Sequence, residues 1–543
     1  MAKLGRNQQC WCGSGKKYKR CHLHTDERAR GGSKSVKPLD QNVLREILAR
    51  QKAQEAVREH MQGKGKPIIS ADFQGYKFVA VGNTLHWSKL EKTQTFVDFL
   101  GNYLRSVLKP EWGNAEIAKP LENRHPVMQW YDGLCRLQQK HYKPGRIFDT
   151  PATGLVMAYN CLAYNLYLLG HNAEVQRHLI GRLKDRNSFY SALYETHVAA
   201  WFILAGFKLS LENEGDPTSS HCEFTAEAPS GQCYSVEAKC RQPGKGHLAI
   251  GNQLYKALGK VASYPRIVCI DMNVRHETIG DPAAFMDDIA KLLREKESSM
   301  TIKGEAAPPA YLFITNIPYH LHLEDENSPR ALLAEGFKIP DFGTKTFPSI
   351  SAAYKARIKH GDVLSVAHAF QNYQVPSTFD GELPEFAFGD AERRFVIGDR
   401  HKMDDGTVGT LRQGVVIEQE KSAILVYETD DGKHLMYKGP LSDAELSAYK
   451  RHPETFFGKV ERVGRTADTA MELYDFFYEA HKNTPRERLL EWFASSPDIE
   501  ELRKLPTEEL RFVCAERYTM GAIGDKEVPD LVRVNSNERK PSG

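Results

Sequence analysis

Long apolar runs are missing from this chain of 543 residues. A transmembrane helix needs about 18 or more consecutive apolar residues, and the sequence offers no such stretch. The first residues are polar and soon include Cys10, which is not the pattern of a signal peptide. We therefore expect a cytoplasmic protein that has no membrane partner.

Excess charge of one sign is also lacking. The formal net charge is +3, so binding of nucleic acid cannot be argued from the whole chain, and any basic surface must be local. Low-complexity tracts are absent, and the length suffices for three or four domains. Only ten cysteines occur, and outside the first segment they are scattered among apolar residues. That distribution favours reduced thiols rather than a disulfide framework.

Three of these cysteines lie close together near the start, and a histidine follows the last of them directly. They are Cys10, Cys12, Cys21 and His22. Three thiolates and one imidazole suit a closed tetrahedral zinc site, and the intervening glycines let the chain turn back on itself. Because so short a segment has no core, the bound metal must supply its folding free energy.

Residues 5–24 closely resemble the SEC-C motif, which is named for the C-terminus of the SecA translocation motor. The resemblance implies that the zinc ligands are Cys10, Cys12, Cys21 and His22. His24 is an alternative to His22 as the fourth ligand. If the segment binds no zinc, its cysteines would form disulfides or remain unused thiols. The similar module of SecA binds the chaperone SecB and the ribosome, which implies a protein partner here. The basic run over residues 16–20 fits a phosphate, an acidic partner or a solvated surface equally well.

A second pattern begins with an apolar helix expected from Tyr194 to Ala205, which Gly206 ends. A strand over 207–211 follows, then a hairpin of two strands over 221–226 and 233–240. A helix over 253–262 and buried strands over 266–270 and 310–314 complete the region. This alternation predicts an α/β fold in which helices flank a central mixed sheet.

Glu237 and Lys239 share one face of the last hairpin strand, because side chains of a strand alternate between faces. The other face is apolar, and Glu223 on the neighbouring strand can lie beside Glu237. Two carboxylates suit Mg²⁺, and an adjacent lysine can orient a water or stabilise charge on a phosphate. On a solvated face, the same Glu-x-Lys pair would be only a weak ion pair.

This order of elements over residues 188–320 resembles the PD-(D/E)xK nucleases, a family that includes many restriction endonucleases. The resemblance implies a restriction-endonuclease-like fold with site residues on successive elements, namely Glu195, Glu223, Glu237, Lys239 and Gln253. Cys222-Glu223 replaces the Pro-Asp of the family name. Asp216-Pro217 has the reverse order and is expected to lie in a loop.

The implied activity is that of an endonuclease that hydrolyses phosphodiester bonds with Mg²⁺ or Mn²⁺, and we expect DNA as the substrate. Glu223, Glu237 and the carbonyl of Ala238 would hold the metal, and Lys239 would position the attacking water. Glu195 would order the metal shell, and Gln253 would steady Lys239 or a phosphate. By analogy the setting is bacterial defence or repair.

Two other interpretations use the same residues. The chain could be a non-catalytic adaptor with a degenerate nuclease fold, in which the zinc module binds a chaperone or the ribosome. The other is a second zinc site built from His221, Cys222, Cys233 and Cys240, although this spacing fits no common zinc finger.

Composition and pattern divide the chain into eight segments. They are a zinc module (1–25), a linker with a charged helix (26–66), a mainly helical domain (67–187), the nuclease-like domain (188–320), a connecting region (321–390), a small β module (391–440), a helical C-terminal region (441–532) and a disordered tail (533–543). Within the β module, strands are expected over 415–427 and 433–438, around the turn Asp430-Asp431-Gly432.

Overall fold

A computed structural model describes residues 7–10, 12, 14–21, 58–59, 63–90, 93, 95–141, 150–211, 221–242, 250–326, 329–343, 347–379, 395–403, 406–451, 456–457 and 469–523. The chain divides into two compact units, residues 1–57 and 58–543. Residues 26–57 of the expected linker and charged helix, the tail over 533–543, His22, His24 and Asp216-Pro217 lie outside the described residues.

The described part of the first unit is a tight reversal that leads into a short 3-10 helix, η1 (Tyr18–Arg20). An antiparallel bridge pairs Gln9 with Lys17. Gly15 has φ +69°, a left-handed conformation that glycine adopts without strain. Cys10 is buried against the tyrosine ring of η1. These few contacts form no independent core, so another source of stability is required.

A six-stranded mixed sheet forms the centre of the second unit, with the order β11-β10-β7-β6-β5-β4. Three consecutive strands pair antiparallel: β4 (Lys208–Leu211), β5 (Phe224–Glu227) and β6 (Cys233–Cys240). β7 (Arg266–Asp271) and β10 (Ala310–Asn316) then add in parallel, and β11 (Ala331–Phe337) closes the far edge antiparallel. The expected central mixed sheet is therefore present.

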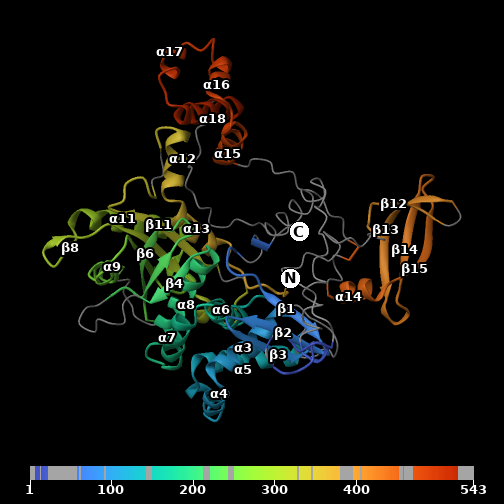
Figure 1. Cartoon of the computed structure of the whole chain (residues 1–543). Coiled ribbons are helices and arrows are strands. Elements are labelled where there is room, and N and C mark those ends of the chain that lie inside the picture. The colour runs from blue at the N-terminus through green and yellow to red at the C-terminus, as the bar shows by residue number, and fades with distance from the viewer. Residues whose placement is uncertain are drawn as a thin grey trace. The chain divides into compact units, whose positions relative to one another are not determined.

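Helices cover both faces of this sheet (Figure 1). One face packs against α6 (Gly154–Leu169), α8 (Phe189–Leu204) and α13 (Gly361–Gln371). The opposite face packs against α9 (Ile250–Leu258) and α11 (Pro282–Ser299). Val236 and Ala238 of β6 point into the first core, as the alternation of its side chains predicts.

The helix α8 ends close to where the sequence places its end. It runs to Leu204, and Gly206 follows with φ +89°. The helix α9, in contrast, ends at Leu258, so the expectation of a helix over 253–262 is wrong for its last residues. Gly259 and Lys260 leave the helix, and Val261 instead forms a parallel bridge with His221.

The residues before the central sheet form a three-stranded antiparallel sheet and a group of helices. The strands are β1 (Ile69–Phe73), β2 (Tyr76–Val81) and β3 (Thr84–Lys89). The helices are α3 (Phe96–Leu108), α4 (Pro110–Ile117), η3 (Leu121–Asn123), α5 (Pro126–His141) and α7 (Ala173–Lys184). The helices α3, α6 and α7 share one hydrophobic core with α8 and the central sheet.

Short elements connect the main strands and helices of the sheet region. They are α10 (His276–Ile279), β8 (Thr301–Ile302), β9 (Glu305–Ala306) and η4 (Tyr319–Leu321). The last of these follows β10 directly and packs against α6.

Towards the C-terminus, a four-stranded antiparallel sheet has its own small core. Its strands are β12 (Arg400–Lys402), β13 (Val408–Ile417), β14 (Ser422–Thr429) and β15 (His434–Pro440). The single strand expected over 415–427 is wrong, because η5 (Glu418–Glu420) and Lys421, at φ +45°, turn the chain there.

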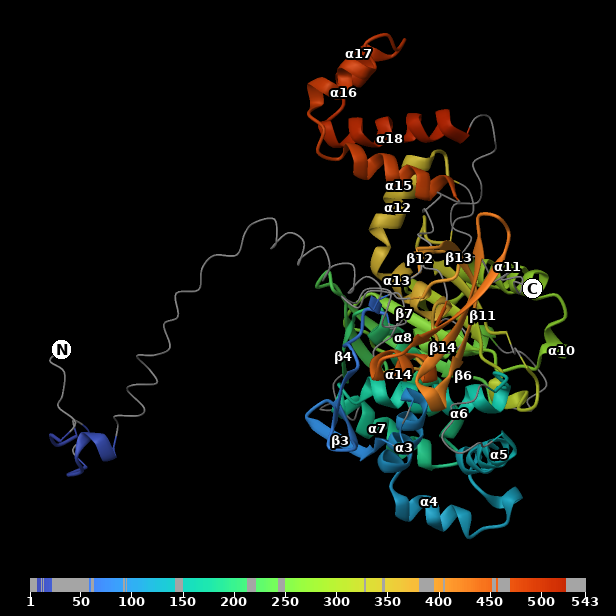
Figure 2. The ribbon, with the colours of Figure 1, turned by 90° about the vertical axis from the view of Figure 1, so that its right-hand side faces the viewer.

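The remaining helices are α12 (Ile350–Lys359), α14 (Asp443–Arg451), α15 (Ala470–His481), α16 (Arg486–Trp492), α17 (Ile499–Leu502) and α18 (Thr507–Ile523). Of these, α12, α15 and α18 lie together (Figure 2), and their aromatic side chains share one hydrophobic core. Among the helices that the structure describes, none is long and apolar enough to cross a membrane.

Candidate functional site

Three thiols converge in the first unit. The sulfur atoms of Cys10, Cys12 and Cys21 all lie within 4.8 Å of one another, and those of Cys12 and Cys21 are 3.5 Å apart. None of the three forms a disulfide. Zinc binds thiolates at about 2.3 Å, so three sulfurs at such separations can share one ion. The fourth expected ligand, His22, is not among the described residues.

Ser14 lies between two of these thiols. Its hydroxyl oxygen lies 3.2 Å from Cys12 Sγ and 3.3 Å from Cys21 Sγ. A hydrogen bond that the Ser14 hydroxyl donates to the Cys12 thiolate favours the charged form and is the main cause that lowers the pKa of Cys12 to about 6. Burial, in contrast, raises the pKa of Cys10. The thiolate is the form that binds a metal, so the surroundings of Cys12 favour the ligand state.

A second cluster lies on the central sheet, where β5 and β6 run side by side. Glu223 directly precedes β5, and its backbone N–H donates to the carbonyl of Val236 at 2.9 Å. The pairing of the two strands therefore extends to Glu223 and places it next to Glu237. Glu237 is only 1% exposed, whereas Lys239 on the same face is partly exposed.

Two lysines join these carboxylates. Lys239 Nζ contacts the Glu237 carboxylate and lies 4.0 Å from Glu223 Oε1. Lys260 Nζ lies 3.1 Å from Glu223 Oε1 and 3.0 Å from Glu237 Oε2. These last two oxygens cannot be farther apart than the sum of the two distances, which is about 6 Å. The residues expected to share a metal are thus close neighbours.

An arginine extends the cluster to α8. Arg182, in the last turn of α7, donates to both carboxylate oxygens of Glu195, one of them at 2.7 Å. The same guanidinium lies 3.7 Å from Glu223 Oε2. The structure therefore brings Glu195, Glu223, Glu237 and Lys239 into one network of ion pairs.

Arg182 and Lys260 were not identified from the sequence. Neither belongs to a recognisable motif, and Lys260 falls within a segment that was expected to continue as a helix. The basic character of the two residues was the only available signal, and basic residues are common on surfaces. Their contacts depend on how α7 and the end of α9 pack against the sheet edge.

Burial is the strongest influence on the ionisation of the cluster. It raises the pKa of Glu237 to about 6, with repulsion from Glu223 as the next cause. The same two causes raise the pKa of Glu195. For Lys260, burial opposes the charged form, but Glu237 and Glu223 outweigh it and raise the pKa. The three carboxylates and three cations of the network balance in formal charge.

The buried carboxylate of Glu237 lies against two ammonium groups, because Lys239 Nζ contacts one of its oxygens and Lys260 Nζ lies 3.0 Å from the other. Hard divalent cations prefer such carboxylate oxygens. As a set of three, Glu195, Glu223 and Glu237 are too far apart to share one ion, so at most two of them are ligands in this conformation.

Gln253 is not joined to this network. The helix α9 packs against β6 and β7. The side-chain oxygen of Gln253 is buried and has no hydrogen-bond partner within the part of the chain that the structure describes. Its expected role therefore stays a prediction.

The alternative of a zinc site at the hairpin is wrong. His221, Cys222, Cys233 and Cys240 all lie among the described residues, and within those residues only Cys10, Cys12 and Cys21 form a metal-sized group of cysteine, histidine or acidic side chains. Cys222 is buried, and its thiol faces the carbonyl of Val261 at 3.5 Å.

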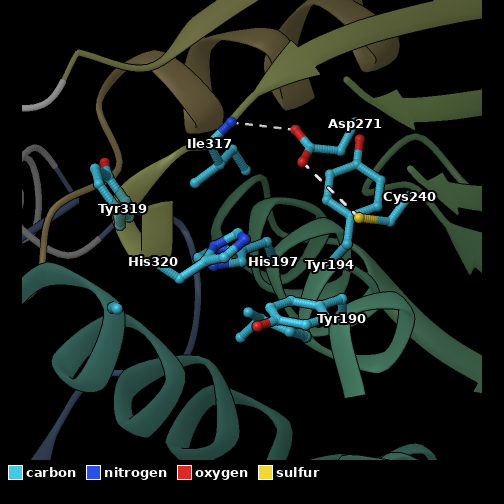
Figure 3. A pocket seen from close by; sticks show the side chains of 10 residues that line it. Tyr190, Tyr194, His197, Cys240, Asp271, Ile317, Tyr319 and His320 are labelled. Carbon is cyan, nitrogen blue, oxygen red and sulfur yellow. Dashed lines mark hydrogen bonds between the residues drawn. The ribbon is translucent and has the colours of Figure 1, made fainter. Parts of the chain in front are cut away.

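A small cavity lies beside α8 (Figure 3). Its lining includes Cys240, Asp271 and His320. Asp271 accepts hydrogen bonds from Thr315 Oγ1 at 2.9 Å and from the backbone N–H of Ile317 at 3.1 Å. Burial nevertheless raises its pKa to about 7. Because Lys239 and Cys240 are successive residues of one strand, this cavity and the side chains of Glu237 and Lys239 lie on opposite faces of the sheet.

Comparison with known proteins identifies one segment. Residues 6–23 match the SEC-C motif. No curated protein and no solved structure matches the chain. The motif match and the three converging thiols agree on a SEC-C motif with a cysteine cluster that can bind metal.

Proposed function

We propose that the second unit is a metal-dependent nuclease of the PD-(D/E)xK type, which hydrolyses phosphodiester bonds of DNA, and that the zinc-bound SEC-C module docks a partner. The observation that carries this proposal is the meeting of Glu223, Glu237 and Lys239 at one point on the central sheet. The order of the elements that carry these residues supports it, because α8, β4, β5, β6 and α9 follow one another as the resemblance implies.

A divalent metal fits this cluster on two grounds. Carboxylate oxygens are ligands that hard divalent cations prefer, and an oxygen of Glu223 lies within about 6 Å of an oxygen of Glu237. Glu223 and Glu237, with the carbonyl of Ala238, would hold Mg²⁺ or Mn²⁺. When bound, such an ion neutralises charge that develops on a phosphate.

The side chains of the protein have distinct roles in this proposal. Lys239 is partly exposed and lies against Glu237, so its ammonium can hold a water or stabilise the negative charge of the transition state. Glu195 is fixed by two hydrogen bonds from Arg182 and acts as a positioning residue. Arg182 also lies 3.7 Å from Glu223 Oε2 and attracts that carboxylate.

The non-catalytic adaptor remains the second candidate, because the network is balanced in charge without any metal. Arg182, Lys239 and Lys260 already neutralise the three carboxylates. In that case, only the SEC-C module would act, by binding a protein. The lysines and arginine at residues 16–20 are exposed and suit an acidic partner.

Cleavage assays separate the two functions. The purified full-length protein is incubated with Mg²⁺ and plasmid, linear DNA, branched DNA or RNA. We expect cleavage of DNA by the parent and its loss in Glu237→Ala. The control is Glu227→Ala, because Glu227 also forms an ion pair with a lysine of the sheet, but its side chain is exposed. Failure of the parent to cut any of these nucleic acids contradicts the nuclease and leaves the adaptor.

A further inference from the structure

Lys260 holds a central position in the carboxylate cluster. Its ammonium lies 3.1 Å from an oxygen of Glu223 and 3.0 Å from an oxygen of Glu237. Lys239, in contrast, contacts Glu237 closely but lies 4.0 Å from Glu223. Lys260 therefore bridges the two carboxylates, and a divalent ion bound to the same two oxygens would compete with its ammonium.

The backbone around Lys260 is fixed on both sides. Its carbonyl accepts a hydrogen bond from Arg266 at 3.2 Å, at the start of β7. The next residue, Val261, pairs with His221 in a parallel bridge, two residues before Glu223. The same bridge therefore sets Lys260 beside Glu223. The side chain of Lys260 can therefore move without breaking these backbone contacts, whereas its backbone cannot.

An ammonium between two carboxylates excludes a divalent cation by repulsion and by occupying its space. Two positive groups a few ångströms apart repel strongly in a partly buried site. Mg²⁺ also keeps several waters when it binds, and the bridging ammonium leaves no room for them between the two oxygens.

We propose that Lys260 is an internal counter-ion that competes with the catalytic metal for Glu223 and Glu237 and must withdraw before the metal binds. This inference rests on the proposed function, because it assumes that the two carboxylates form the metal site. A phosphate of the nucleic acid offers the displaced ammonium a new partner. The metal and the nucleic acid then strengthen each other's binding, as linkage requires of two coupled ligands.

Calorimetric titration of the zinc-loaded full-length protein with Mn²⁺, without nucleic acid, tests this proposal. We expect Lys260→Met to bind Mn²⁺ about tenfold more tightly than the parent, or tighter still, because a neighbouring positive charge is removed. Lys260→Arg keeps the charge and should bind as weakly as the parent. The control is Lys208→Met, which removes an exposed lysine of the same sheet that pairs with Glu227. Glu237→Gln should abolish Mn²⁺ binding, which would show that the measured binding occurs at Glu237.

Removal of Lys260 leaves two carboxylates close together, which can weaken folding without metal. The melting temperature of Lys260→Met should therefore rise more on addition of Mn²⁺ than that of the parent. If Lys260→Met does not fold, Lys260→Gln offers an uncharged amide to the same oxygens and gives the same comparison.

Two results would overturn the proposal, and they differ in their meaning. If the parent binds Mn²⁺ through Glu237 and the uncharged variant binds it no more tightly, Lys260 does not compete and the nuclease proposal stands. If neither the parent nor the variant binds Mn²⁺ in a manner that depends on Glu237, the metal site itself is wrong and both proposals fail.

Discussion

Glu237 is the residue on which the cluster depends most. It is buried, and two ammonium groups lie against its carboxylate. A buried ion pair contributes little to stability by itself, but loss of one partner leaves an uncompensated charge. Substitutions in this network therefore affect both metal affinity and stability, and the two effects have to be measured separately.

Glu195→Gln should weaken the fold more than the metal site. The amide replaces one acceptor of the Arg182 guanidinium with a donor, so one of two partly buried hydrogen bonds is lost, at a cost of about 1–3 kcal/mol. Metal affinity should change by only a few-fold, because Glu195, Glu223 and Glu237 do not together form a single metal-sized group. Thermal melting and Mn²⁺ titration measure the two effects. A loss of affinity as large as that of Glu237→Gln would show that Glu195 is a ligand.

Asp271 provides a test of burial at a single acid. Its folded-state pKa of about 7 lies above the usual value of about 3.9 for an unfolded chain. The folded state therefore binds the Asp271 proton more tightly, and folding stability falls as pH rises from the unfolded-state pKa through the folded-state pKa. Asp271→Asn keeps an oxygen acceptor for Thr315 and Ile317 and removes this pH-dependent loss of stability.

The stability of Asp271→Asn relative to the parent should therefore increase between about pH 4 and pH 7, by about 4 kcal/mol at most. Melting temperatures of the two proteins over this range give the result. A difference that does not change with pH would mean that Asp271 ionises normally.

At the scale of elements, the start of α6 is held by the segment that follows β10. The backbone N–H groups of Gly154 and Leu155 donate to the carbonyls of Asp325 and Leu323, at 3.0 and 2.9 Å. These bonds satisfy donors that the first turn of a helix leaves free. The approach is so close that a Cβ at Gly154 would overlap the carbonyl oxygen of His322.

Gly154→Ala should therefore destabilise the second unit by about 1–3 kcal/mol or more. The matched control is Gly181→Ala in α7, where an added Cβ meets no atom within 4 Å. That change should be neutral or stabilising by up to about 1 kcal/mol, because alanine is the better helix former. Chemical unfolding of the two variants distinguishes them. Equal effects would mean that α6 does not depend on this close approach.

The sequence predicts those parts of the site that depend on patterns of neighbouring residues. Alternation of side chains placed Glu237 and Lys239 together, and the hairpin placed Glu223 beside them. Apolar runs between polar loops located β7 and β10. The partners on other elements could not be found in this way. Lys260 is 37 residues from Glu223, and no periodicity encodes a contact that depends on where α9 ends. The break between β13 and β14 was also missed, because Lys421 rather than glycine takes the left-handed conformation.

At the scale of the whole molecule, the two units differ in what stabilises them. The second unit contains a large hydrophobic core around the central sheet. In the first unit, the buried side chains among the described residues are Cys10 and Tyr18, with Cys21 packed against them. So small a cluster cannot offset the conformational entropy of the segment. The cysteine cluster can bind a metal ion, and we propose that bound zinc provides this folding free energy.

Zinc removal should consequently unfold one unit and spare the other. We expect one zinc per chain and loss of protection of residues 7–21 in hydrogen exchange after chelation, while the melting transition of the second unit is kept. Metal analysis and hydrogen exchange on the reduced protein measure both effects. The control is Cys135→Ser, which removes a thiol outside the cluster and should not change the zinc content. Freshly purified protein without zinc would contradict this account.

The single-turnover rate of DNA cleavage by Lys239→Ala, compared with that of the parent, tests the central claim most directly. Lys239 faces Glu237 and Glu223 and is not part of the apolar face of β6. The variant should therefore fold and bind Mn²⁺, yet cleave more slowly by about 10²-fold or more, as when one donor to a transition state is removed. Lys208→Ala should cleave at the parent rate. If Lys239→Ala cuts as fast as a parent that demonstrably cleaves the same substrate, the carboxylate cluster is not the nuclease site.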